Sequence, residues 1–385
     1  MALTVLLASA GKAAPAEKLE IRFCPEKVVR PYPLDSIRGI QGLLVQNIAV
    51  VNKGKVPRAI AEIEIALLEG DRVIDTRSIK GPSLDAAVRT AQAVKAQGIL
   101  ELAPFQFCDG RLLGDASFSE QTKIMPGQAL LLMQQVFAYR GARNRVRVTA
   151  RADDMGSEVA SAFIPIDAAG SATRFRWPLA GTRTWLVAAA ASFHTTHRWA
   201  VPEEFALDII AVDADGNSHS GAGDANADFY AYGADVVAAA DGVVAKLVSG
   251  GPEETPLLRK PDEAMNAYYA RIGERQARNL ASGEAGVVGD GVVIDHGNGE
   301  YSVYAHLRPG SVKVRVGERV RSGTVIGSLG SSGNSTEPHL HFQICDRPSV
   351  LSCAAIPPSF VDILLPAADG DRPVQSGDLV RAGKD

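Results

Sequence analysis

The sequence predicts a mostly β protein with two globular parts, an N-terminal β-sandwich-like domain and a C-terminal domain with a curved β-sheet and a helical insertion. Three observations support this prediction. The first half alternates apolar and polar residues between turns, the second half repeats short strands interrupted by glycine, and few stretches have helical periodicity. A chain of 385 residues is long enough for two or three domains, and its hydrophobic content of 46% is typical of a packed core.

Residues 17–165 form the predicted N-terminal domain. Segments such as "LLVQNIAVVNKG" and "NRVRVTARADD" are rich in β-branched residues or alternate in polarity, and turns follow them. Regularly spaced strands of this kind are typical of a β-sandwich. Residues 84–103 have a more helical composition. Because this domain contains no histidine and no recognisable catalytic group, we expect it to have a binding, spacing or inhibitory role.

The segment that follows is small and polar with one proline, which predicts a linker over residues 166–182. We expect the second domain over residues 183–368 and a C-terminal tail over residues 369–385. In the second domain, "YGADVVAAADGVVAKLVSG" and "VKVRVGERVRSGTVIGSLGSSG" share a rhythm of short strands broken by glycine, which indicates tightly curved β-structure and an approximate internal duplication. Between them, apolar residues at near-helical spacing predict a helical insertion over residues 251–286.

The N-terminus, "MALTVLLASAGKAAPAEK", has an apolar run too short to span a bilayer, followed by the small-x-small site Ala14-Pro15-Ala16. We therefore expect residues 1–16 to be a signal peptide, and the protein to be exported to the periplasm or outside the cell. A frayed apolar terminus is the alternative. No later stretch predicts a transmembrane segment. The net charge of −4, without a run of lysines or arginines, argues against a nucleic-acid partner.

The chain has four cysteines, Cys24, Cys108, Cys345 and Cys353. An even number in an exported protein predicts two disulfides. A local bridge between Cys345 and Cys353 is easy to close and would leave Cys24 to pair with Cys108. Three pairings remain open at this point, and four buried thiols are the alternative.

The histidines suggest chemistry in the second domain. In "PHLHFQI", His339 and His341 are two residues apart, so in a strand both side chains point to one face, with Cα atoms about 6.6 Å apart. In "EYSVYAHLRPG", His306 ends a predicted strand just before a turn, where a scaffold can present a side chain to a cleft. His296, at an Asn-Gly turn, and His219, in a glycine-rich loop, are more typical of structural or solvated positions.

A third cluster, "SFHTTHRWAVPEEFALDII", contains His194, His197 and Asp208. Asp208 lies in an apolar stretch, and a buried carboxylate is costly unless it is paired or binds a metal ion. A loop that returned His197 to Asp208 would supply a nitrogen and an oxygen ligand. Zinc prefers such ligands, and a catalytic zinc site keeps one position open for water.

Together these segments resemble the lysostaphin-like zinc metallopeptidases, which are peptidoglycan endopeptidases of bacteria. The resemblance extends over residues 194–360 and is strongest in "FALDII", "YGADVVAAADGVV" and "GVVIDHGNGEYSVYAHLRPGSVKVRVGERVRSGTVIGSLGSSGNSTEPHLHF". It does not include residues 17–165. The implied fold of the second domain is the lysostaphin-like curved sheet with its duplicated motif.

The resemblance implies a role for five residues. His197, Asp208 and His341 fall on the positions that bind one zinc ion, and His306 and His339 fall on the positions of the catalytic histidines that do not bind it. One of these two would orient or deprotonate the water that zinc activates, and one would protonate the leaving amine. The sequence does not divide these roles between them.

The sequence departs from the common family pattern in two ways. The first ligand histidine precedes the aspartate by eleven residues, or by fourteen if His194 is the ligand, instead of four; the "HR…FALD" pattern favours His197. Glu337 and Gln343 also stand where the family often has glycine and glutamate. Neither position is a ligand in the family, so we expect these changes to affect the shape and charge of the cleft.

The implied function is zinc-dependent hydrolysis of peptide bonds in the stem or cross-bridge peptides of peptidoglycan. The alternative is a non-catalytic module that binds the cell wall or activates a hydrolase while keeping the same fold. The long interval between the histidine and Asp208 motivates this alternative. Under it, regulatory cell-wall proteins would be the partners.

Overall fold

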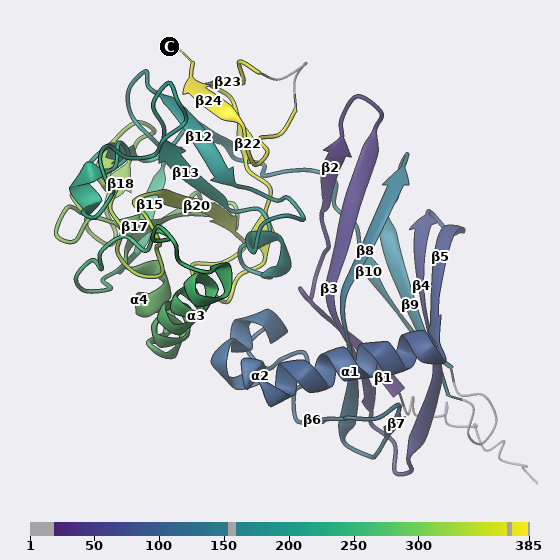
Figure 1. The fold of residues 1–385 in the computed structure, drawn as a ribbon. Helices are drawn as coiled ribbons and strands as arrows, with labels where there is room; N and C mark the ends of the chain where they lie inside the picture. Colours follow the sequence, from purple (N-terminus) through teal and green to yellow (C-terminus); the bar gives the residue numbers. More distant parts are fainter. Residues whose placement is uncertain (1–18, 153–158, 368–371, 384–385) are drawn as a thin grey trace, which may run out of the picture.

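The computed structural model describes residues 19–152, 159–367 and 372–383, and it shows two parts that lie side by side (Figure 1). Both parts are built mainly from strands, which confirms the predicted fold class. Within these residues, no helix is both long and apolar enough to span a bilayer. The predicted signal peptide over residues 1–16 lies outside the described residues.

The N-terminal part is a pair of five-stranded sheets. One sheet contains β1 (Leu19–Cys24), β2 (Pro31–Asp35), β3 (Ile40–Asn52), β6 (Ser117–Phe118) and β8 (Gln128–Arg140). The other contains β4 (Arg58–Glu69), β5 (Arg72–Lys80), β7 (Lys123–Ile124), β9 (Arg145–Ala152) and β10 (Val159–Pro165). Alternate apolar side chains of the two sheets, such as Ile48 of β3 and Ile63 of β4, share one buried core. This is the packing of a β-sandwich.

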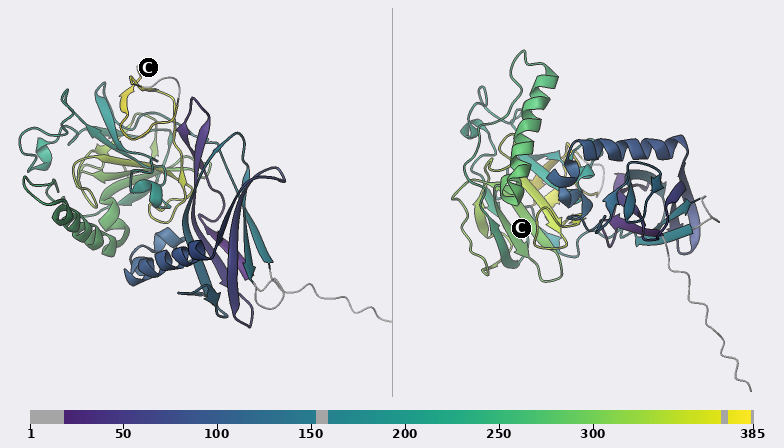
Figure 2. Two further views of the ribbon diagram at one scale, coloured as in Figure 1. Left: turned by 45° about the vertical axis from the view of Figure 1, so that its right-hand side comes forward. Right: turned by 90° about the horizontal axis from the view of Figure 1, so that it is seen from below.

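Three helical segments connect β5 to β6, in and just beyond the stretch whose composition favours a helix. They are α1 (Pro82–Ala96), α2 (Ile99–Leu102) and the 3-10 helix η1 (Pro104–Phe107). Helix α1 begins at a proline, which is well tolerated in the first turn, and it packs on β8 and β5. It leads to α2 beside the second part of the molecule (Figure 2).

The second part contains a ten-stranded sheet. Its strands are β12 (Thr184–Ala189), β13 (Leu207–Ala211), β15 (Gly242–Val248), β16 (Asp290–Asp295), β17 (Tyr301–Leu307), β18 (Arg319–Val320), β20 (Leu340–Cys345), β21 (Ala355–Ile356), β23 (Ile363–Leu364) and β24 (Leu379–Ala382). Along the sheet the order is β18-β15-β16-β17-β20-β13-β12-β24-β23, with β21 beside β20. The central strands β17, β20 and β13 position the candidate site.

Smaller elements complete this part. Two short sheets pair β11 (Arg174–Phe175) with β22 (Ser359–Phe360) and β14 (Asp235–Val237) with β19 (Val325–Ser328). The segments that form the approximate duplication pair with each other, since β14 pairs with β19 and β15 with β18. The helices are α3 (Met265–Ala281), α4 (Gly283–Val288), η2 (His197–Trp199) and η3 (Asn226–Asp228). Helix α3 lies within the predicted insertion and packs against α2 (Figure 2).

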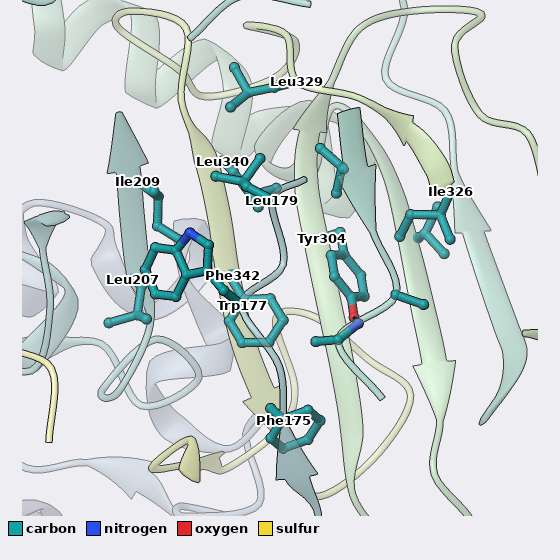
Figure 3. Close-up of a cluster of buried hydrophobic side chains, with 14 of the residues drawn as sticks. Phe175, Trp177, Leu179, Leu207, Ile209, Tyr304, Ile326, Leu329, Leu340 and Phe342 are labelled. Carbon is teal, nitrogen blue, oxygen red and sulfur yellow. Dashed lines mark hydrogen bonds between the residues drawn. The ribbon is translucent and has the colours of Figure 1, made fainter. Parts of the chain in front are cut away.

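The predicted linker is not a free connection along its whole length. Phe175, Trp177 and Leu179 are at most 2% exposed and belong to the core of the second part (Figure 3). These three residues are spaced two apart, as side chains on one face of a strand are. The composition of residues 166–182 is dominated by small polar residues, which conceal this period of two.

The predicted C-terminal tail also differs from the structure. Strand β24, within residues 369–385, pairs with β12 and β23 and so belongs to the main sheet. Val380 on β24 is fully buried. A four-residue strand with one buried side chain is too short to give a periodic signal in the sequence.

Two disulfides are present, as predicted. Cys24 at the end of β1 is bonded to Cys108, just after η1, and Cys345 at the end of β20 is bonded to Cys353. The first bridge fixes the helical connection to the sandwich. The second closes a short loop beside the strand that carries His341.

Candidate metal centre

The register of the main sheet brings Asp208 and His341 together. Asp208 on β13 is directly opposite His341 on β20, and their Oδ1 and Nδ1 atoms are 3.1 Å apart. On the other side of β20, His341 is opposite Ala305 of β17, which places His306 one residue further along that strand. Neighbouring strands therefore hold Asp208 and His341 in contact, although 133 residues separate them along the chain, and the ring of His306 lies with its centroid 5.8 Å from that of His341.

His197 reaches the same point from the loop before β13. It is the first residue of η2, its imidazole is buried, and its Nε2 lies 3.2 Å from Oδ2 of Asp208. Potential ligand atoms of His197, Asp208 and His341 all lie within 4.8 Å of one another. His194 is exposed and does not belong to this group. The structure therefore places His197, and not His194, beside Asp208.

Hydrogen bonding leaves Nδ1 of His341 available to a metal ion. Its Nε2 lies 2.7 Å from Oε1 of Gln343, which can only accept a hydrogen bond, so Nε2 donates. The amide of Gln343 is oriented in turn because its Nε2 donates to the carbonyl of Val350 at 3.2 Å. An imidazole held by its second nitrogen in this way is typical of a metal ligand.

His306 and His339 are fixed differently. Nδ1 of His306 donates to the carbonyl of Ser332, and Nδ1 of His339 donates to the carbonyl of Glu337, both at 2.8 Å. Each imidazole therefore keeps Nε2 for proton transfer. Their ring centroids are 4.7 Å apart, and Nε2 of His339 is 3.4 Å from Oδ1 of Asp208. His306 also has a positive φ of 61°, a strained conformation that often marks a functional position.

The charges of the cluster are strongly coupled. Burial opposes ionisation of Asp208, but His197 and His339 outweigh it and hold the pKa of the carboxyl well below its usual range. Burial also opposes protonation of His339, but the Asp208 carboxylate outweighs it and raises the pKa of that imidazole. Burial and the neighbouring imidazoles His339 and His341 hold the pKa of His306 well below its usual value, because the attraction of Asp208 is too weak to offset them. A carboxylate at the centre of three histidines is suited to bind a cation.

The cluster lies in a cleft of about 640 Å³. Besides the segments that carry Asp208, His306, His339 and His341, the lining includes the α2–η1 segment of the N-terminal part, helix α3 of the insertion, and the loop that carries His197. Much of the lining is apolar, including Ile99, Leu102, Phe105, Trp199, Ile272 and Leu280. The contribution of the N-terminal part to the cleft could not be predicted, because no pattern of residues along the chain links residues 99–106 to His341.

The other histidines are outside this group. His296 is bonded through Nδ1 to the carbonyl of Asp241 and through Nε2 to the hydroxyl of Ser302, both at 2.8 Å. The ring of His219 lies against that of Phe229 in a tilted arrangement, with the centroids 5.1 Å apart. Gln343 is the supporting residue whose role sequence reasoning missed. Its place two residues after His341, on the same face of the strand, is the signal that could have indicated it.

Comparison with known proteins identifies the class. Residues 225–351 match the family model "Peptidase family M23". The DD-carboxypeptidase/endopeptidase Mpg of Neisseria meningitidis is 46% identical over 61 residues, which are 16% of this chain and 14% of Mpg. The peptidoglycan DD-endopeptidase ShyC of Vibrio cholerae is 46% identical over 55 residues, which are 14% of this chain and 12% of ShyC. The matches therefore span only a small part of these relatives.

Among solved structures, the catalytic domain of the antimicrobial peptidase lysostaphin from Staphylococcus simulans aligns with 45% of this chain and 88% of its own, at 17% identity and a TM-score of 0.25. The sequence match defines a peptidase domain. That domain, over residues 225–351, belongs to peptidase family M23; it contains His306, His339 and His341 and begins after His197 and Asp208.

Proposed function

We propose that the protein is a zinc-dependent endopeptidase that hydrolyses peptide bonds in the stem or cross-bridge peptides of peptidoglycan. The observation that carries this proposal is the meeting of His197, Asp208 and His341 in a cleft that also contains His306 and His339. The names of relatives such as the peptidoglycan DD-endopeptidase ShyC support the substrate class. A substrate in the bacterial cell envelope requires an exported enzyme, so we also propose a periplasmic or extracellular location.

The donor atoms fit zinc. Two imidazole nitrogens and one carboxylate, with a fourth position left open, are a typical ligand set of catalytic zinc. His197 would bind through Nε2 and His341 through Nδ1, since these atoms face Asp208. Gln343 orients His341 by accepting a hydrogen bond from its Nε2. A single zinc ion would bind all three residues.

When bound, zinc supplies Lewis acidity, which polarises the scissile carbonyl group and makes a water molecule more acidic. The chain supplies the proton transfers. A backbone carbonyl holds Nδ1 of His306 and of His339, so Nε2 is the nitrogen of each that can take a proton from water or give one to the leaving amine. Their bonds to the main chain fix the ring orientations before the substrate arrives, which reduces the ordering needed in the transition state.

Release of peptides from purified peptidoglycan tests this function. The protein is assayed as isolated, after removal of metal by a chelator, and after zinc is added back. We expect hydrolysis to be lost on chelation and restored by zinc, because the three ligands cannot perform the reaction without the ion. Hydrolysis that survives complete removal of metal would contradict the zinc mechanism. A folded, zinc-loaded protein that releases no peptide would favour the non-catalytic module.

Zinc affinity is expected to rise with pH. Burial opposes protonation of His341, but the hydrogen bond and charge of Asp208 outweigh it and raise the pKa of the imidazole to about 9. The metal-free protein therefore carries a proton on His341 at neutral pH, and this proton must leave before Nδ1 binds zinc. Below that pKa, apparent affinity should increase up to about tenfold per pH unit. Titration calorimetry in buffers of different ionisation enthalpy measures the released proton; zinc binding at neutral pH without proton release would contradict this prediction.

A further inference from the structure

We infer that the N-terminal part of the chain holds the loop that carries His197, so that the metal centre is completed across the contact between the two parts. Gln46 of β3 is the central positioning residue. The inference rests on the proposed function, because it concerns the affinity of the same zinc site. It assigns the N-terminal part a role in metal binding in addition to lining the cleft.

The loop between β12 and β13, residues 190–206, has little regular structure of its own apart from η2. Its anchor is Arg198, which follows His197 and is completely buried. The guanidinium donates from Nη1 to Oε1 of Glu204 at 2.7 Å, within the same loop. Because this ion pair is buried, Oε2 of Glu204 and the backbone carbonyl of Arg198 need hydrogen-bond donors from outside the loop.

The N-terminal part supplies such groups. The side chain of Gln46 is 1% exposed, and its Nε2 donates to the backbone carbonyl of Arg198 at 3.0 Å and to Oε2 of Glu204 at 3.3 Å. The amide of Gln46 therefore contacts both Arg198, which is next to His197, and the carboxylate of Glu204, which pairs with Arg198. A buried amide with two acceptors specifies a single position of the loop, since movement of the loop would leave polar atoms without partners.

Aromatic packing acts at the same place. The guanidinium of Arg198 lies 5.6 Å from the ring centroid of Tyr32, on β2 of the N-terminal part. The rings of Phe193 and Phe205, both from the loop, lie 5.4 and 5.2 Å from it. These distances are within the range of cation–π interactions. The arginine is thus enclosed by one ring from the N-terminal part and two from its own loop.

A second hydrogen-bond path reaches the loop from η1. The backbone N–H of Val201 donates to Oε1 of Gln106 at 3.0 Å. The carbonyl of Gln106 accepts a hydrogen bond from Nδ2 of Asn47, the neighbour of Gln46 on β3, at 2.7 Å. Strand β3 therefore fixes the loop both directly and through η1.

These contacts affect the affinity for zinc, because His197 can bind the ion only when the loop holds it beside Asp208. If the loop is ordered for only a fraction of the time, the apparent dissociation constant increases in inverse proportion to that fraction. Gln46 does not contact the three ligands or the cleft histidines through any hydrogen bond of the described residues. Its loss should therefore weaken zinc binding without removing a group that takes part in the chemistry.

The test compares two substitutions on one strand of the full-length protein. Gln46→Met keeps the length of the side chain and removes its donor. Gln41→Met makes the same change on β3 at a side chain that has no hydrogen bond to the described residues. The zinc dissociation constant is measured by competition with a chelating dye, and the visible spectrum of the cobalt-substituted protein reports the geometry of the ligands.

We expect Gln46→Met to weaken zinc binding about tenfold, to alter the cobalt spectrum, and to recover peptide release at saturating zinc, while Gln41→Met matches the wild type. Thermal unfolding of the metal-free variants checks that both are folded. Wild-type zinc affinity and cobalt spectrum in folded Gln46→Met would overturn the inference, as would equal weakening by Gln41→Met. A wild-type protein that binds no zinc would instead overturn the proposed function on which the inference rests.

Discussion

Replacing His341 with alanine is expected to abolish stoichiometric zinc binding and to lower peptide release at least about a thousandfold, since the Lewis acid contributes several kcal/mol to the transition state. Nδ1 of His341 faces Asp208 while Nε2 is bonded to Gln343, so the substitution removes one of the three donor atoms of the proposed site. Metal content after dialysis and the rate of peptide release measure the two effects.

The matched control for this substitution is His194→Ala. His194 is exposed in the loop that carries His197 and lies outside the ligand group. We expect this variant to keep its zinc and its activity. Loss of zinc from His194→Ala, with normal zinc in His197→Ala, would show that the wrong histidine of the loop has been assigned to the metal.

Replacing His306 or His339 with asparagine is expected to lower the rate by about a hundredfold to ten-thousandfold while zinc stays bound, which is the range for loss of a general acid or base. Asparagine is chosen for His306 because the residue has a φ of 61°, which asparagine tolerates better than alanine does. Zinc content and the rate of peptide release are measured on the same samples.

Zinc content and rate together distinguish a metal ligand from a residue that transfers protons. Zinc loss in either asparagine variant, at a level similar to that of His341→Ala, would place that histidine among the ligands. A rate within tenfold of the wild type, with zinc bound, would remove it from the proton-transfer steps. His296→Asn is a suitable control, because the imidazole of His296 is bonded to Asp241 and Ser302 and is not among the residues that line the cleft.

Much of the candidate site could be predicted from local sequence. The two-residue spacing of His339 and His341 places both on one side of a strand, and an aspartate among apolar residues indicates a buried carboxylate. These features are properties of short segments. Two disulfides also followed from the number and spacing of the cysteines, and the structure contains both.

Other features depend on contacts between distant segments, which periodicity does not report. The direct pairing of Asp208 with His341 is a matter of strand order, since β13 and β20 are neighbours only in the folded sheet. The contact of Gln46 with Arg198 crosses 152 residues. The burial of Trp177 was also not predictable. Its segment has only three alternating apolar residues among small and polar ones, so the composition favoured a linker over a strand.

Anomalous X-ray scattering at the zinc absorption edge, from crystals of the purified protein, tests the central claim most directly. We predict a single strong peak at about 2.0–2.2 Å from Nε2 of His197, Nδ1 of His341 and a carboxylate oxygen of Asp208, with His306 and His339 beyond bonding distance. A peak bound by His194, His306 or His339 in place of one of these three residues, or no peak after zinc is supplied, would contradict the account.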